Sequence, residues 1–131
     1  MILKGVEATR YFAKPDPSRA GLLIFGADTM RVAMKRAEVI AITFEQIADE
    51  DWWIGGQTLA ELGQSAFQLY ISITDETNTK AEKAQYLQAV FETMQTHCPR
   101  LHATSYIHVI DARAAAYGYG GKTQEYRYHH S

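Results

Sequence analysis

Two stretches of the chain read alike: Asp51-Trp52-Trp53-Ile54-Gly55-Gly56-Gln57-Thr58 and Ala116-Tyr117-Gly118-Tyr119-Gly120-Gly121-Lys122-Thr123. Paired glycines beside aromatic residues are typical of a tight hairpin. Aligning Gly55 with Gly120 brings the two stretches into register, and twice the interval between them nearly spans the whole chain. A fixed offset of this kind indicates an internal repeat. The sequence therefore predicts a single domain over 1–131, made of two repeats over 1–60 and 66–131.

Strands are predicted before each hairpin. Val39–Phe44 precedes the first glycine pair and Thr104–Ile110 precedes the second, and both runs are apolar and rich in β-branched residues. Each repeat also opens on a strand, and the offset aligns Ile2, Val6 and Ala8 with Phe67, Ile71 and Ile73. In the second copy apolar and polar residues alternate, which indicates a half-buried strand: Phe67, Leu69, Ile71 and Ile73 face one way, and Gln68, Tyr70, Ser72 and Thr74 the other.

A helical pattern separates the two strands of each repeat. Asp16 is suited to cap the first helix, with Pro17 at its first position, and the apolar stripe of that helix runs Ala20, Leu23, Ile24, Ala27, Met30 and Met34. The spacing of Thr79 and Glu82 fits a capping box at the start of the second helix. Pro99 marks its end, and its apolar stripe runs Ala84, Leu87, Val90, Phe91 and Met94.

Strand–helix–strand units predict parallel strand pairs with right-handed crossovers. The expected fold class is α/β (α+β), a two-layer sandwich in which tandem βαβ repeats form a four-stranded mixed sheet with two helices on one face. The segment 57–65 joins the halves. The other sheet face carries small, polar and aromatic residues, which predicts either a subunit interface or a solvated surface: Ala41, Thr43, Glu45, Tyr70, Ser72, Tyr106 and His108.

Composition argues against several classes of protein. A net charge of −2 is not the basic field of a general nucleic-acid binder. No apolar run approaches the ~18 residues that cross a membrane. The one cysteine, Cys98, cannot form an internal disulfide, which favours a cytoplasmic location, and it is predicted as a small apolar filler near a helix end.

Neither a cofactor nor a metal is expected. Gly120-Gly121-Lys122-Thr123 is similar to the end of a phosphate-binding loop, but Ala116 stands where that motif needs glycine. The motif must also open a helix, and the sequence ends soon after it, at Ser131. His129-His130 has no acidic or cysteine residue near it in the sequence, so a frayed tail is expected there rather than a metal site.

The βαβ pattern followed by an aromatic residue and a Gly-Gly hairpin resembles the tautomerase superfamily. Two such units in one chain resemble its fused 4-oxalocrotonate tautomerase-type, dehalogenase-like and decarboxylase-like members. The resemblance is carried by Trp52–Gly56, by Tyr117–Gly121 and by the start of the second helix, Thr77–Lys83. It covers nearly the whole chain and is clearer in 66–128 than in 1–60.

The resemblance implies a homotrimer, with active pockets at the sheet edges near the N-terminal strand. It also implies a small carboxylate-containing substrate of the keto or enol acid class. In the family an N-terminal proline acts as general base or acid, arginines hold the substrate carboxylate, and a hairpin aromatic residue forms a wall of the pocket. A hetero-oligomer, in which a partner chain supplies the proline, is a further possibility.

This sequence departs from the family at its base. Residue 2 is Ile2, and the chain has only Pro15, Pro17 and Pro99, none of them at a strand start. Methionine is not normally removed before isoleucine, so Met1 is expected to remain. Its α-amine, with a reference pKa of about 7.7–8.0, is the candidate replacement base, since burial or a neighbouring cation would lower that pKa.

Arginines are the candidate clamps for a substrate carboxylate, because guanidinium binds carboxylate bidentately. Arg10 is predicted at the end of the first strand, Arg113 follows the fourth strand, and Arg127 lies in the C-terminal tail. Either of the last two could reach the pocket of a neighbouring subunit. For each of the three, a solvated surface charge is the alternative.

Trp52 and Tyr117 are equivalent under the repeat. The resemblance makes each a pocket wall, or makes Tyr117 a hydrogen-bond donor, and packing at an interface is the alternative. His108, Glu125 and Tyr126 are weaker candidates for the site. Two functions therefore stand: a tautomerase-like enzyme with an atypical or lost base, and a non-catalytic ligand-binding or assembly subunit on the same scaffold.

Overall fold

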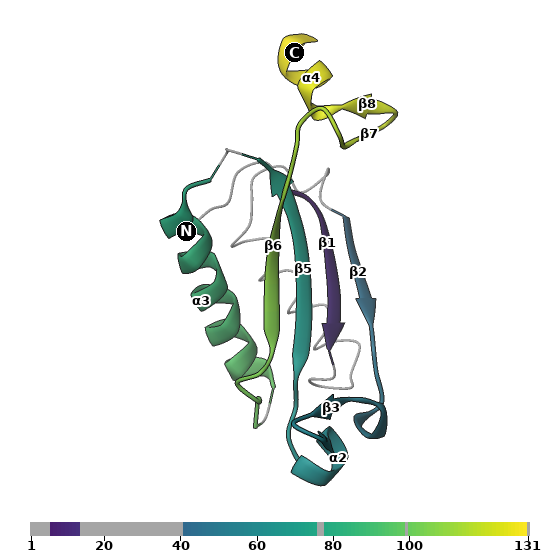
Figure 1. Cartoon of the computed structure of the whole chain (residues 1–131), viewed down its shortest axis with the longest axis vertical. Helices are drawn as coiled ribbons and strands as arrows, with labels where there is room; N and C mark the ends of the chain where they lie inside the picture. The colour runs from purple at the N-terminus through teal and green to yellow at the C-terminus, as the bar shows by residue number, and fades with distance from the viewer. Residues whose placement is uncertain (1–5, 14–40, 76–77, 99, 131) are drawn as a thin grey trace.

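The computed structural model describes residues 6–13, 41–75, 78–98 and 100–130 (Figure 1). Four strands form one sheet in the order β2-β1-β5-β6: β1 is Val6–Ala13, β2 is Ala41–Glu45, β5 is Phe67–Thr74 and β6 is Tyr106–Ala112. The pairs β1/β2 and β5/β6 are parallel, whereas β1 and β5 are antiparallel. A parallel pair needs a crossover, and α3, Lys80–His97, provides it between β5 and β6.

The predicted α/β class and its β-α-β unit are confirmed. The first predicted helix, from Asp16 to Met34, lies outside the described residues, as does the β1–β2 crossover.

Both predicted hairpins are present, and they keep the offset of the sequence repeat. β3, Trp53–Ile54, pairs with β4, Gln57–Thr58, while β7, Gly118–Tyr119, pairs with β8, Lys122–Thr123. A short helix follows each hairpin: α2, Leu59–Leu62, and α4, Gln124–His130. All four turn glycines have positive φ, which a two-residue hairpin of this kind requires: Gly55 (59°), Gly56 (83°), Gly120 (62°) and Gly121 (78°). A 3-10 turn, η2, Asp49–Asp51, precedes the first hairpin.

The first strand is longer than the repeat predicts. Under the repeat alignment, the counterpart of Thr74, the last residue of β5, is Thr9, yet β1 continues to Ala13. The extension keeps its antiparallel pairing, since Ala13 is opposite Phe67. The sequence predicted that Arg10 ends this strand, and that prediction is wrong. The residue lies inside β1, paired with Thr43 of β2 on one side and Tyr70 of β5 on the other.

The main core lies between β5 and α3. The alternation predicted for β5 is confirmed, because Phe67, Leu69, Ile71 and Ile73 are fully buried. Thr74 is also buried, at 2% exposure. Cys98 is buried at the end of α3, as predicted for a small apolar filler.

The buried stripe of α3 differs from the predicted one. Tyr86, Val90 and Met94 face the sheet, each one helical turn after the last, while Leu87 is 36% exposed. The predicted stripe did not include Tyr86. Its ring nevertheless completes a row at helical spacing over the apolar face of β5.

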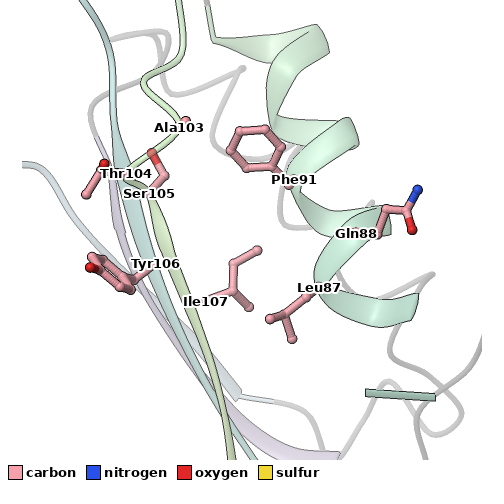
Figure 2. Close-up of a pocket in the computed structure, with 8 residues that line it drawn as sticks. All are labelled: Leu87, Gln88, Phe91, Ala103, Thr104, Ser105, Tyr106 and Ile107. Carbon is pink, nitrogen blue, oxygen red and sulfur yellow. The ribbon is translucent and has the colours of Figure 1, made fainter. Parts of the chain in front are cut away.

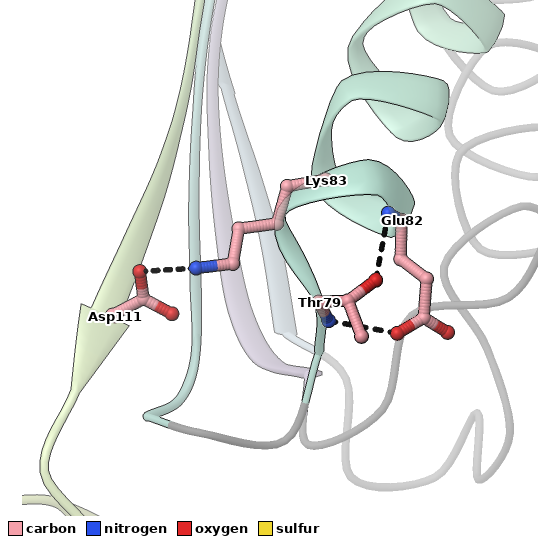
Figure 3. A network of polar contacts seen from close by, with 4 residues as sticks. All are labelled: Thr79, Glu82, Lys83 and Asp111. Atoms are coloured by element: carbon pink, nitrogen blue, oxygen red, sulfur yellow. Dashed lines mark hydrogen bonds and ion pairs between the residues drawn. The ribbon is translucent and has the colours of Figure 1, made fainter.

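The start of α3 is fixed by two side-chain interactions (Figure 3). The predicted capping box is confirmed: Glu82 N donates to Thr79 Oγ1 at 3.1 Å, and Thr79 N donates to Glu82 Oε1 at 2.8 Å. One residue further on, Lys83 Nζ lies 2.7 Å from Asp111 Oδ2. This ion pair joins the first turn of α3 to the end of β6.

A second, smaller core lies at the other end of the sheet. Trp52, Leu59 and Ala66 are buried there, with Ile47, Ile54 and Leu62 packed around them. On the sheet face opposite α3, the rings of Tyr70 and His108 stack at 4.7 Å with only 7° between their planes. Tyr106 on the same face is 56% exposed. No α-helix within the described ranges is long and apolar enough to cross a lipid bilayer.

Candidate functional site

One end of the sheet gathers the chemistry-bearing residues of the second repeat. Because β1 and β5 are antiparallel, the start of β1 lies where β5 finishes, and Val6 is opposite Ile73. β6 finishes at the same end, with Ala112 paired to Thr74. From there the chain continues into Arg113 and the β7–β8 hairpin, which extends beyond the sheet with α4 (Figure 1). We call this region the β5/β6 end.

Tyr117 is anchored at the β5/β6 end. Its hydroxyl forms a short hydrogen bond with Thr74 Oγ1, and either oxygen could be the donor. The residue also helps to line a pocket of about 220 Å³ on the hairpin, together with Ala115, Ala116, Gly118, Gly121, Lys122 and Thr123. Lys122 supplies a cation to this pocket and was not among the sequence candidates. Its position directly after the glycine pair, on the strand that returns toward Tyr117, was the signal that could have identified it.

The two C-terminal arginines lie in different surroundings. Arg113 directly follows β6, as predicted. Arg127 lies on α4, where its Nη2 donates to the Tyr119 carbonyl at 2.7 Å and its guanidinium carbon lies 3.7 Å from the Tyr119 ring centroid. The Nε of Arg127 is buried and has no acceptor in the described part of the chain. Within one chain, Arg127 therefore stabilises the packing of α4 on its own hairpin.

Arg10 and Trp52 are not brought to the β5/β6 end. Arg10 pairs with Tyr70, well before the end of β5 at Thr74, which places it ~13 Å along the sheet from that end. Trp52 is buried in the second core, at the opposite end of the sheet. The antiparallel centre of the sheet explains this separation, because it sends equivalent points of the two repeats to opposite ends. Within one chain, Trp52 and Tyr117 therefore do not share a pocket. Met1 lies outside the described residues.

The weaker candidates do not line the pocket on the β7–β8 hairpin. His108 stacks on Tyr70, and its ring centroid is 5.9 Å from that of Tyr106. Tyr126 stacks on His130 at 4.0 Å, with Lys122 Nζ 5.4 Å from its ring centroid. Glu125 is exposed on the first turn of α4.

Two expectations about the C-terminus are wrong. A helix does follow Gly120-Gly121-Lys122-Thr123, and the segment expected to fray is the end of that helix, α4. Stacking of Tyr126 on His130 and a hydrogen-bonding contact of 2.9 Å between His130 Nδ1 and the Tyr126 carbonyl hold the last turn. The first amides of α4 donate within the chain: Gln124 N to the Tyr117 carbonyl and Glu125 N to the Ala114 carbonyl. They do not form the outward-facing anion cradle of a phosphate loop.

Metal ligands do not cluster in the part of the chain that the structure describes. No group of three or more His, Cys, Asp or Glu side chains there is arranged to hold a metal ion. The groups near the β5/β6 end are instead a phenol, two cations and hydroxyls, which suit the binding of a small anion.

Comparison with known proteins identifies the fold and not a sequence family. No protein-family model matches the chain, and no curated protein matches its sequence. Solved structures do match over nearly the full length. Pt0534, in a structure inactivated by 2-oxo-3-pentynoate, superposes with a TM-score of 0.74 at 10% identity, covering 92% of this chain and 98% of that chain.

Fused 4-OT proteins also match well. The symmetric trimer of the wild-type fused 4-OT called W0 has a TM-score of 0.68 at 16% identity, over 90% of this chain and 98% of that chain. The asymmetric trimer of the one called R7 has a TM-score of 0.70 at 17% identity, over 92% and 98%. The predicted resemblance to fused 4-oxalocrotonate tautomerase-type chains is thereby confirmed at the level of the fold.

Proposed function

We propose that this chain, which has the fold of the fused 4-OT proteins, assembles as a cytoplasmic homotrimer and acts on small keto or enol carboxylic acids. It would do so as one domain, 1–131, whose two repeats create two non-equivalent sheet ends. The trimers of its structural neighbours support the assembly. Inactivation of Pt0534 by a 2-oxo acid supports the substrate class.

The observation that carries the proposal is the pocket of about 220 Å³ at the β5/β6 end, which both Tyr117 and Lys122 help to line. A substrate carboxylate would bind Lys122, with Arg113 as a second cation from the same end of the sheet. The substrate's carbonyl oxygen would then lie near the Tyr117 hydroxyl, which Thr74 holds in place. A phenol in that position stabilises the negative charge that develops on an enolate oxygen.

Ketonisation of an enol acid requires a base that accepts the proton of the enol hydroxyl and then delivers a proton to a carbon of the same skeleton, as the C=C bond becomes the C=O bond. We assign this role to the α-amine of Met1, because β1 starts at the β5/β6 end. A primary amine there replaces the secondary amine of proline. In the trimer, Arg10, Arg127 and Trp52 would serve pockets completed by a neighbouring copy.

The second candidate function is a ligand-binding or assembly subunit without catalysis. Ile2, which stands where the family has its catalytic proline, favours this alternative. A related possibility is a hetero-oligomer in which another chain brings the base to the pocket. Both alternatives keep the fold of this chain. In the first the proton acceptor is lost, and in the second another chain supplies it.

The experiment is a ketonisation assay on small 2-hydroxy-dienoates and phenylenolpyruvate, using protein whose N-terminus has been verified by mass. Activity that disappears on N-terminal acetylation supports the Met1 amine as base. A silent parent with an active Ile2→Pro variant supports the binding or hetero-oligomer alternative, with a pocket that lacks only its base. Silence in both chains rejects catalysis on these substrates.

Two variants locate the pocket in an active chain. Lys122→Met should raise KM, because it removes the cation that binds the substrate carboxylate. Tyr117→Phe should lower kcat, because it removes a donor needed mainly in the transition state. Tyr128→Phe, on an exposed part of α4, is the matched control. Equal activity of all three variants would exclude the β5/β6 pocket as the site.

A further inference from the structure

A hydrogen bond between two hydroxyl groups joins the sheet to the second hairpin at the β5/β6 end. Thr74 is the last residue of β5, and its Oγ1 pairs with the hydroxyl of Tyr117. Ile73, one residue earlier, packs in the main core against α3. Because side chains alternate along a strand, Thr74 points to the opposite face of the sheet. The phenol of Tyr117 therefore meets the sheet on the face away from α3.

The two partners of this hydrogen bond differ in their access to a ligand. Thr74 is 2% exposed, whereas Tyr117 is half-buried and helps to line the pocket of about 220 Å³. Thr74 is not among the described residues that line this pocket. A ligand in the pocket can therefore contact the phenol directly, while Thr74 acts on that ligand only through the phenol.

The hairpin fixes the backbone of Tyr117 independently of Thr74. Gln124 N donates to the Tyr117 carbonyl at 2.9 Å. The next residue, Gly118, packs so closely on the Lys122 carbonyl that no side chain fits at its position. The hairpin does not fix the direction of the phenol's O–H bond, because a hydroxyl hydrogen rotates until a partner holds it. Thr74 is such a partner.

The direction of that bond decides what the phenol can do for a ligand. A hydrogen bond between two hydroxyl groups uses one of their two protons. If Thr74 is the donor, the proton of Tyr117 serves a third group, and the bond that Tyr117 accepts strengthens it as a donor.

We propose that Thr74 is a positioning residue. It donates to the hydroxyl oxygen of Tyr117, and so directs the phenol proton to the oxygen on C2 of a bound 2-oxo carboxylic acid. This inference rests on the proposed function, in which Lys122 binds the carboxylate next to that oxygen. It makes the pocket selective for acids that carry an oxygen at C2 over acids that do not.

The repeat does not account for this pair of hydroxyl groups. Under the repeat alignment, Thr9 is the counterpart of Thr74 and Trp52 is the counterpart of Tyr117. Thr9 is opposite Ile71, inside the sheet, while Trp52 is buried in the second core. Tryptophan also carries no hydroxyl. The hydrogen bond at the β5/β6 end is therefore a property of the second half and not of the shared pattern.

A larger pocket, of about 480 Å³ between α3 and the start of β6, lacks these features (Figure 2). Leu87 and Phe91 from α3 face Ile107 from β6 across it, and none of the described residues that line it is charged. Its serine hydroxyl is engaged by the backbone, because Ser105 Oγ donates to the carbonyl three residues earlier and accepts from the first amide of β5. This pocket therefore provides a reference site for the test.

The test compares how tightly the full-length chain binds 2-oxobutyrate and butyrate, which differ only in the oxygen at C2. Dissociation constants are measured by NMR titration, so the test does not depend on catalysis. The parent should bind 2-oxobutyrate about tenfold more tightly, the size expected for one hydrogen bond. Tyr117→Phe should abolish this preference.

Two replacements of Thr74 isolate its hydroxyl. Thr74→Val keeps the shape of the side chain and should reduce the preference to about threefold, because the phenol proton is no longer directed, while butyrate binds as in the parent. Thr74→Ser keeps a hydroxyl and should retain the preference of the parent. Thr104→Val makes the same chemical change at the larger pocket and should leave both dissociation constants unchanged.

The outcomes separate this inference from the proposed function. If neither acid binds the parent, or if Lys122→Met leaves butyrate binding unchanged, the proposed site and the inference both fail. If both acids bind and Thr74→Val keeps the full preference, or the parent has no preference, the site stands and the inference is refuted. Equal losses in Thr74→Val and Thr74→Ser, or weaker butyrate binding in Thr74→Val, would show that Thr74 only supports the hairpin, which also overturns it.

Discussion

Replacing Tyr86 with phenylalanine is expected to stabilise the protein. Tyr86 is fully buried, and its hydroxyl has no hydrogen-bond partner in the described part of the chain. A buried hydroxyl without a partner costs about 1–3 kcal/mol in lost hydration. Its removal leaves a void of about 15 Å³, which costs about 0.4 kcal/mol at about 24 cal/mol per Å³. The net gain in the free energy of unfolding is therefore about 1–2 kcal/mol, or about 4–8 °C in Tm.

The same substitution should change the pH dependence of stability. Burial raises the pKa of Tyr86 above its ordinary value of 10.0. The folded protein therefore retains this proton as the pH rises past 10, while the unfolded chain releases it. Because the unfolded state then binds fewer protons, the parent loses stability in that range. The Tyr86→Phe variant lacks this contribution, so its advantage should grow above pH 10.

Urea and thermal unfolding at pH 7 and at pH 10.5 measure both effects, at one protomer concentration because assembly contributes to apparent stability. Tyr106→Phe is the control, since Tyr106 is 56% exposed. The reasoning fails if Tyr86→Phe destabilises the protein by about 1 kcal/mol or more, because that result would reveal a hydrogen bond to the hydroxyl.

Three further substitutions test local features. Thr79→Ala removes the cap of α3 and should cost about 1 kcal/mol in chemical unfolding; no change would show that the helix does not depend on its cap. Gly118→Ala should disrupt the second hairpin, since a Cβ there would lie 1.9 Å from the Lys122 carbonyl oxygen; a native-like NMR spectrum for the hairpin amides would contradict this. Lys83→Met breaks the partly exposed ion pair with Asp111 and should cost less than about 1 kcal/mol, with a difference that shrinks in high salt.

Much of the fold could be predicted because its signals are local. Paired glycines demand φ values that other residues resist, so both hairpins were recognised at the correct residues. The capping box of α3 depends on two side chains that lie one helical turn apart. The alternation of apolar and polar residues in β5 depends only on the burial of one face of the strand. Each of these is a short-range rule that holds regardless of what the rest of the chain does.

The errors arose where tertiary structure decides. β1 continues past Thr9 to Ala13 because β5 offers it a pairing edge. Tyr11 and Phe12 favour a strand there, but the repeat alignment did not take them into account. The buried face of α3 differs from the predicted one because it includes Tyr86, whose aromatic ring behaves as an apolar group once it packs on the sheet.

The candidate site was harder to predict than the fold. Arg113 and Tyr117 were selected and do share the β5/β6 end. Lys122 was not, because it was considered only as part of a phosphate-loop motif. Arg127 was a candidate clamp with a solvated surface charge as the alternative, and its contact with Tyr119 was not predicted, because only the three-dimensional course of the hairpin and α4 brings the two side chains together.

The antiparallel pairing at the centre of the sheet also has a consequence for how the chain folds. Tyr70 pairs with Arg10 on one side and with His108 on the other, and Arg10 is much the more distant of the two along the chain. Closing the longer loop costs more entropy, and contacts between distant residues slow folding. We therefore expect the β5-α3-β6 half to form first and β1 to add to it afterwards. During synthesis, the first strand would leave the ribosome long before its partner in the centre of the sheet exists.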